Sequence, residues 1–340
     1  MNDTLRWNLA DADSPQLSMF PDARREVGIG EYRGLEFYEV MAKTIINKVP
    51  GPPRFGFQYS VNPYRGCSHA CTYCFARPTH EYLGLNAAED FDSKIIVKIN
   101  AVERLTAEIH PSKWGGDLIA LGTNTDPYQR AEGKYRLTRG IVATLTEHNN
   151  RFSVLTKNSL AIRDLDLFAE AARKMDIRVD FSIGTFDEDV WRLTEPGTPH
   201  PRKRMEAVAK LNEAGVPSGV LMGPVIPGLS DDPAQLQEVA KAAVEAGAVS
   251  LGTVLLHVKP ALRDHFLSWI ETERPELLPR YRRLYGSKSF VPDGMQKRVS
   301  QMVHQFAEQA GGLRTYRRHR PQTAQVAPTK PAAEQLRLIG

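Results

Sequence analysis

The only three cysteines of the 340-residue chain, Cys67, Cys71 and Cys74, lie within one eight-residue segment. Thiolates are the usual ligands of iron–sulfur clusters, and spacings of three and two residues let one tight loop surround a small cluster. A cubane cluster has four irons, so three thiolates leave one iron open. Because an electron carrier has a thiolate on every iron, the open position indicates a reactive site. The triplet therefore predicts a catalytic 4Fe–4S centre.

Two other interpretations of the cysteines stay open at this point. His69, or a more distant histidine, could complete a Cys3His zinc site, which would make the chain a zinc-stabilised nucleic-acid-binding module without catalysis. Such sites more often pair two separate ligand pairs, and a histidine between two of the cysteines is awkward for a tetrahedron. A non-catalytic iron–sulfur electron carrier is the third interpretation, and the missing fourth thiolate disfavours it.

Six repeated βα units are predicted to position this loop. From Phe57 onward, short β-branched apolar runs alternate with longer segments of helical period, which is typical of a parallel sheet. Strands are expected at Phe57–Asn62, Asp117–Gly122, Phe152–Thr156, Arg178–Ile183, Ser218–Pro224 and Val249–His257. The period fits an open doubly wound sheet or an incomplete barrel, and in both of them ligands gather at the carboxyl ends of the strands.

The predicted helices have apolar residues at intervals of three and four, and several have recognisable ends. Gly215 and Gly247 stand where helix C-caps belong, and Asp232-Pro233 provides an N-cap followed by a proline in the first turn. The clearest helices are expected at Leu137–His148, Asp164–Met175, Arg202–Ala214 and Ala234–Ala246. Two more helical stretches, Pro260–Tyr285 and Asp293–Glu308, follow the last strand.

Composition divides the chain into four parts. Residues 1–50 lack a sustained period and predict an irregular N-terminal extension, and the turn-forming Gly51-Pro52-Pro53 marks the boundary with a barrel at residues 51–260. Residues 261–312 hold the C-terminal helices. Residues 313–340 are expected to form a basic, disordered tail. Residues 311–340 contain six Lys and Arg and one Glu, so the net charge of +4 comes from this tail and is weak evidence for nucleic-acid binding.

The beginning of the chain lacks the basic start and apolar run of a signal peptide, and no segment approaches the roughly 20 apolar residues that span a bilayer. The sequence therefore predicts a cytoplasmic protein without a membrane partner. Clustered cysteines in such a compartment favour a metal site over disulfides.

The segment Asn62–Arg77, with the pattern NPYRGCSHxCxYCFAR, resembles the radical S-adenosylmethionine (SAM) superfamily, in the branch related to spore photoproduct lyase. The resemblance extends over residues 55–260. It implies a partial (β/α)6 TIM-like barrel, a 4Fe–4S cluster, and SAM bound to the unique iron. It further implies reductive cleavage of SAM to methionine and a 5′-deoxyadenosyl radical, with an external reductant such as flavodoxin or ferredoxin. The substrate stays unknown, and a nucleic acid is suggested by this analogy alone.

The resemblance also implies which side chains contact SAM. Thr125 and Asp126 would hold its amino group, Lys157 its carboxylate and Ser182 its ribose, each with an ordinary structural role as the alternative. Glu195 would border the cofactor, although an ion pair between Glu195 and a neighbouring arginine is equally expected. The implied SAM contacts are Tyr73, Thr125, Asp126, Lys157, Ser182 and Glu195.

The chain departs from the spore photoproduct lyase pattern at two positions. Thr123 occupies the place of a hydrogen-donating cysteine, and Phe75 occupies the place of a tyrosine that follows the third cluster ligand. A hydroxyl cannot replace the thiol, because an O–H bond is far stronger than an S–H bond. We therefore expect that this protein does not repair spore photoproduct by that route.

Overall fold

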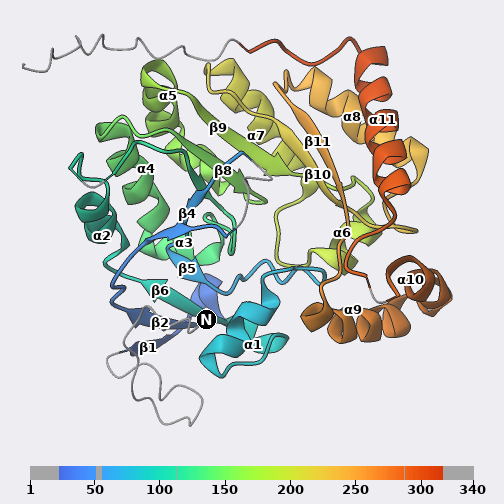
Figure 1. The fold of residues 1–340 in the computed structure, drawn as a ribbon, viewed down its shortest axis with the longest axis horizontal. Helices are drawn as coiled ribbons and strands as arrows, with labels where there is room; N and C mark the ends of the chain where they lie inside the picture. The colour runs from blue at the N-terminus through green and yellow to red at the C-terminus, as the bar shows by residue number, and fades with distance from the viewer. Residues whose placement is uncertain (1–22, 51–55, 113, 287, 317–340) are drawn as a thin grey trace, which may run out of the picture.

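The computed structural model describes residues 23–50, 56–112, 114–286 and 288–316. They form a seven-stranded and a four-stranded sheet with helices around them (Figure 1). Most of the tail predicted at 313–340 lies outside the described residues. Among the described helices, none combines the length and the apolar character needed to cross a membrane.

The seven-stranded sheet contains the six predicted strands, all parallel, with a seventh antiparallel strand at one edge. The strands follow one another in chain order across the sheet, without the reversal of order that defines a doubly wound fold. The sheet is therefore the wall of a partial (β/α)6 barrel. In sheet order the strands are β11 (Leu251–Leu255), β10 (Val220–Val225), β9 (Ile177–Ser182), β8 (Phe152–Thr156), β7 (Ile119–Leu121), β4 (Tyr59–Val61) and β3 (Ile46–Lys48).

The four helices that the sequence predicts most clearly are confirmed to within one residue at each end, and they lie on the outer side of the sheet (Figure 1). Gly215 and Gly247 take φ values of +79° and +66° after their helices, a conformation that glycine adopts without strain. The carboxylate of Asp232 accepts from the backbone N–H of Ala234 at 2.9 Å, as an N-cap should. The helices between the strands are α2 (Ala101–Glu108), α3 (Arg130–Tyr135), α4 (Leu137–Glu147), η3 (Ser159–Asp164), α5 (Leu165–Lys174), α6 (Glu188–Thr194), α7 (Pro201–Glu213) and α8 (Pro233–Glu245).

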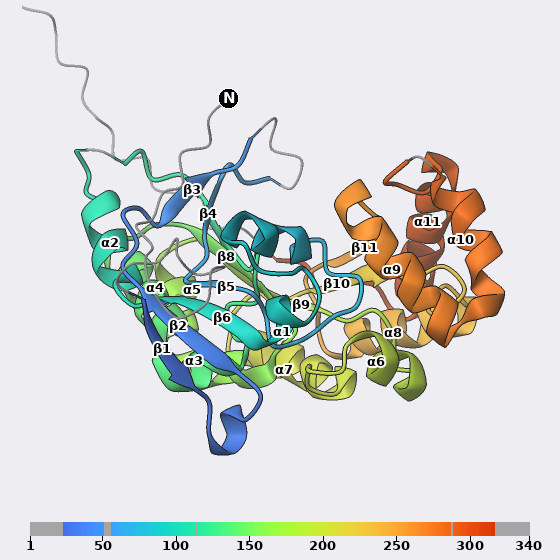
Figure 2. The same ribbon diagram turned by 90° about the horizontal axis from the view of Figure 1, so that it is seen from below.

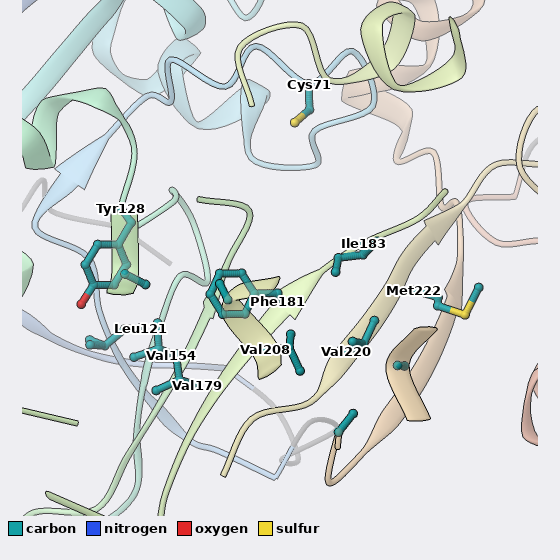
Figure 3. Packing of buried hydrophobic residues seen from close by; sticks show 14 of the residues in the cluster. Cys71, Leu121, Tyr128, Val154, Val179, Phe181, Ile183, Val208, Val220 and Met222 are labelled. Carbon is teal, nitrogen blue, oxygen red and sulfur yellow. The ribbon is translucent and has the colours of Figure 1, made fainter. Parts of the chain in front are cut away.

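The core joins the strands to the helices that cover them. Leu121, Val154, Phe181 and Met222 come from four successive parallel strands and are almost fully buried in one cluster (Figure 3). Cys71 belongs to the same cluster, on a loop beyond the strand that carries Phe181. Burial of these side chains gives the barrel its main stabilisation and places the cysteine loop against it.

The N-terminal extension is not irregular, so that prediction is wrong for residues 24–48. They contain β1 (Arg24–Val27), η1 (Gly30–Tyr32), β2 (Glu36–Val40) and β3. β1 and β2 complete a four-stranded sheet with β6 (Lys94–Lys98) and β5 (Tyr64–Arg65). The strands are too short to show a period, and β2 pairs with a strand more than 50 residues further along the chain. Such a long-range pairing leaves no local signal.

The segment between β4 and α2 contributes β5 and β6 to the second sheet. It also holds the cysteine loop, η2 (Arg77–Leu83) and α1 (Glu89–Ser93). After β11, the predicted stretch Pro260–Tyr285 forms α9 (Pro260–Glu273), η4 (Pro275–Leu277) and α10 (Leu278–Tyr285). It breaks at the residue before Pro275, where helical backbone is disfavoured. Helix α11 (Asp293–Gln309) follows, and Figure 2 shows these C-terminal helices grouped beyond β11.

Candidate functional site: the cysteine loop and the strand ends below it

The cysteine loop runs from β5 to η2 and is fastened by backbone hydrogen bonds. Cys67 and Cys71 are buried, Cys74 is half-buried, and all three thiols are free. The Cys67 N–H donates to the carbonyl oxygen of Phe91 at 2.9 Å, and the Thr72 N–H donates to that of Thr194 at 3.1 Å. Hydrogen bonds to α1 and α6 therefore hold the loop from both sides.

Gly197 lets the segment after α6 approach the cysteine loop closely. Its N–H donates to the carbonyl oxygen of His69 at 3.0 Å. A Cβ atom at this position would lie only 2.2 Å from the carbonyl oxygen of Ser68. Glycine is therefore required here by close contact of two backbones.

Thr125, one of the predicted SAM contacts, holds the cysteine loop instead of standing open. Its hydroxyl donates to the carbonyl oxygen of Gly66 at 2.6 Å. The buried Gln129 amide donates to the same oxygen at 2.9 Å and to the Thr125 hydroxyl at 2.8 Å, and it accepts from the Ser68 N–H at 3.0 Å. Gln129 is not among the residues predicted for the site, although it is the last residue of the polar run that begins at Thr123.

Asp126 is also fully engaged within the protein. Its carboxylate accepts from the Thr156 hydroxyl at 2.6 Å and the Lys157 N–H at 2.7 Å, and it lies 3.3 Å from Nδ1 of His69. Burial alone would raise the pKa of Asp126, but the neighbouring His69 and these hydrogen bonds outweigh it and lower the pKa. Asp126 thus joins the end of β8 to the middle of the cysteine loop.

A second polar group lies at the ends of β8, β9 and β10. The Lys157 ammonium donates to Glu195 at 2.9 Å, to the Ser182 hydroxyl at 2.6 Å and to the carbonyl oxygen of Gly223 at 3.3 Å. The Tyr73 hydroxyl donates to Glu195 as well. Arg204, on α7, lies 2.6 Å from the other Glu195 oxygen. Four predicted SAM contacts, Tyr73, Lys157, Ser182 and Glu195, therefore meet in one place.

The charges of this second group leave one positive charge in excess. Burial raises the pKa of Glu195, but the nearby Arg204 and Lys157 overcome that effect and hold the pKa well below its usual range. Glu195 is therefore ionised, against two cations. Burial raises the pKa of the Tyr73 phenol well above its usual value, and Glu195 adds to the rise. The expected alternative, an ion pair between Glu195 and Arg204, is present, and Lys157 shares it.

The geometry disfavours the zinc interpretation. His69 turns its Nδ1 to Asp126, and its Nε2 lies 3.4 Å from the Asn158 amide nitrogen. Within the described residues, no group of three or more His, Cys, Asp or Glu side chains converges as ligands of a single metal ion. Three soft thiols in one loop, two of them buried and one half-buried, are, however, the donor set of an iron–sulfur cluster.

Comparison with known proteins assigns the chain to a family. The family model of the radical SAM superfamily matches residues 61–243, more than half of the chain. An uncharacterized protein of Mycobacterium tuberculosis is 40% identical over 279 residues, which are 82% of each chain. An uncharacterized protein of Methanocaldococcus jannaschii is 30% identical over 199 residues, which are 58% of this chain and 70% of that one. The chain belongs to the radical SAM superfamily and is an enzyme of radical-based chemistry.

Within that superfamily, the chain has the fold of spore photoproduct lyase. A mutant of that enzyme superimposes with a TM-score of 0.62 at 18% identity, over 82% of both chains. A mutant with bound AdoMet and dinucleoside spore photoproduct gives a TM-score of 0.60 at 17% identity, over 77% of both chains. The predicted fold and family are therefore confirmed. Membership of the family implies SAM, an iron–sulfur cluster and an external reductant.

Proposed function

We propose that Cys67, Cys71 and Cys74 hold a 4Fe–4S cluster and that the enzyme reductively cleaves SAM beside it. The observation that carries this proposal is the position of the cysteine loop. Three free thiols lie on a loop tied to α6, and the polar group around Glu195 lies at the strand ends beside it, where the Tyr73 hydroxyl of the same loop reaches Glu195. The carboxyl ends of parallel strands are where such barrels bind their ligands.

This chain's residues would bind the amino-acid end and the ribose of SAM. The excess positive charge shared by Lys157 and Arg204 suits the SAM carboxylate, and the Ser182 hydroxyl suits a ribose hydroxyl. When bound, the reduced cluster supplies the electron that cleaves the cofactor to methionine and a 5′-deoxyadenosyl radical. Thr125 and Asp126 take a revised role in this proposal. They orient the cysteine loop through Gly66 and His69, and direct contact of their side chains with SAM is secondary.

A nucleic acid is the proposed substrate class, and flavodoxin or ferredoxin is the proposed electron donor. The substrate class is supported by the dinucleoside spore photoproduct bound to a protein of the same fold. The bound ligand in that structure is a dinucleoside, and this chain differs from the lyase pattern at Thr123 and Phe75. We therefore propose a different reaction on a nucleic acid.

The test is anaerobic reconstitution followed by reduction with dithionite in the presence of SAM. The proposal predicts about four irons per chain, since the cluster is a cubane, together with formation of 5′-deoxyadenosine detected by mass spectrometry. One zinc and no iron in protein purified without oxygen would instead favour the zinc module. A cluster that forms but never cleaves SAM under reduction would contradict the proposal.

A further inference from the structure

Three aromatic rings from distant parts of the chain pack together beside the cysteine loop. The centroids of Phe75 and His257 are 5.8 Å apart with an interplanar angle of 34°, and those of His257 and Phe290 are 5.4 Å apart with an angle of 26°. Both outer rings reach solvent, with Phe75 42% and Phe290 58% exposed. We call these three residues the aromatic platform. Exposed aromatic side chains that gather in this way mark binding surfaces.

The platform is held in place by the loops that carry it. Phe75 directly follows Cys74, and His257 follows the carboxyl end of β11 by two residues. The Val258 N–H donates to the carbonyl oxygen of Ser289 at 2.7 Å, which joins the loop after β11 to the loop that carries Phe290. The platform thus stands at the edge of the barrel where ligands gather, next to one proposed cluster ligand.

Positive charge accompanies the rings. The Lys259 ammonium lies 5.4 Å from the centroid of the Phe75 ring, and Lys259 is exposed. Lys288, also exposed, precedes Phe290 by two residues. The segment 257–298 contains nine Lys and Arg and five Asp and Glu. Flat rings flanked by cations are the combination by which proteins bind unpaired bases and their phosphates, because every base has a π-face and every link a negative charge.

We propose that the aromatic platform binds an unpaired base of a single-stranded nucleic acid on Phe290, with Lys259 close to a phosphate. The proposal rests on the proposed function and deepens it by naming the surface that receives the substrate. Phe75 then supports the platform by packing on His257, and it does not take over the role of the tyrosine that the lyase pattern has at this position. An aromatic peptide segment is the competing occupant. Such a peptide would explain the exposed rings, but it has no phosphate to pair with the flanking lysines.

Binding can be measured on the full chain, purified anaerobically, by fluorescence anisotropy with a labelled single-stranded oligodeoxythymidine. Phe290→Ala should weaken binding about tenfold or more, and Phe290→Tyr should retain it, because stacking on one ring is lost only in the first variant. Met41→Ala is the matched control. Met41 is 56% exposed and lies beside β2, on the second sheet, and its loss should leave binding unchanged. Lys259→Gln should reduce the slope of the logarithm of the binding constant against the logarithm of the salt concentration by about one.

Each outcome decides the proposal. Equal affinities of the wild type and Phe290→Ala for the oligodeoxythymidine overturn it. Binding of an aromatic peptide without binding of the oligodeoxythymidine overturns it as well. The failure of the proposed function is a separate result, because release of 5′-deoxyadenosine without substrate is measured on the wild-type chain alone. If wild type releases none, the proposed function fails, while the binding data still judge the platform.

Discussion

The Lys157 ammonium lies 2.9 Å from the Glu195 carboxylate, although 38 residues separate them in the chain. Lys157 directly follows β8, and Glu195 directly follows α6. Arg204 holds the second oxygen of the same carboxylate at 2.6 Å. The ion pair therefore connects two strand-end loops and, through the Tyr73 hydroxyl, the cysteine loop.

Glu195→Gln should destabilise the protein by about 3 kcal/mol, because it leaves the buried Arg204 and the largely buried Lys157 without their anion. Urea unfolding followed by tryptophan fluorescence measures this change. Glu188→Gln is the matched control: Glu188 is an exposed glutamate of α6 that pairs with Arg192, and its replacement should cost less than about 0.5 kcal/mol. Equal losses in the two variants would show that the buried pair has no special weight.

Each of Cys67→Ser, Cys71→Ser and Cys74→Ser should lower the iron content and abolish formation of 5′-deoxyadenosine, because each removes one proposed thiolate ligand. Thr72→Val is the control within the same loop. Within the described residues the buried Thr72 hydroxyl has no hydrogen-bond partner, so its loss should be tolerated. Iron analysis and the visible spectrum are the measurements. A serine variant with full iron content would remove that cysteine from the ligand set.

Gly197→Ala should displace the cysteine loop, since its Cβ atom would meet the Ser68 carbonyl oxygen at 2.2 Å and Cα of His69 at 2.9 Å. We expect a loss of stability of about 1–3 kcal/mol, as for other overpacked sites, and incomplete loading with iron. Gly294→Ala is the control, because the added atom meets only the Arg298 side chain at 3.7 Å. Normal stability and iron content in Gly197→Ala would show that the loop can move aside at no cost.

The free energy of unfolding should rise with pH through the titration of Lys98. This lysine is buried and donates to the carbonyl oxygen of Asn62 at 2.7 Å, and burial, with the nearby Arg65 charge, lowers its pKa to about 7. The unfolded chain keeps the proton up to an ordinary pKa of 10.5, so between these values the unfolded state binds more protons. The slope contributed is up to about 1.4 kcal/mol per pH unit.

Lys98→Met should remove this slope. Urea unfolding of both proteins at several pH values between the two pKa values of Lys98 measures the difference, and contributions from all other groups cancel in it. Parallel curves for the two proteins would mean that Lys98 stays charged in the folded state.

Spore photoproduct should not be repaired by this protein when SAM and dithionite are supplied, because Thr123 and Phe75 replace the hydrogen-donating cysteine and the tyrosine of the lyase pattern. The Thr123 hydroxyl instead interacts with the Asn62 side-chain amide at 3.1 Å. Chromatography of the products from a dinucleoside spore photoproduct checks this. Repair at a substantial rate by the wild-type chain would show that another residue donates the hydrogen.

Much of the fold could be predicted because it depends on local patterns. The apolar period within each segment defines the six strands and their helices, and Gly215, Gly247 and Asp232 mark helix ends through backbone preferences of single residues. The second sheet could not be predicted in this way. β2 obtains its stability from pairing with β6, and short strands acquire a defined partner only when the chain between them has folded.

The candidate site, too, could be predicted in part from the sequence. The sequence by itself determined which residues can do chemistry, since three cysteines at this spacing are a local property of one loop. Only the tertiary structure decided what the other polar residues do. It turned Thr125 and Asp126 toward the cysteine loop, joined Lys157 to Glu195 and brought Phe75 to His257 and Phe290. A buried charged or polar group must bind a partner close to it. Which partner is close depends on three-dimensional packing and not on spacing along the chain.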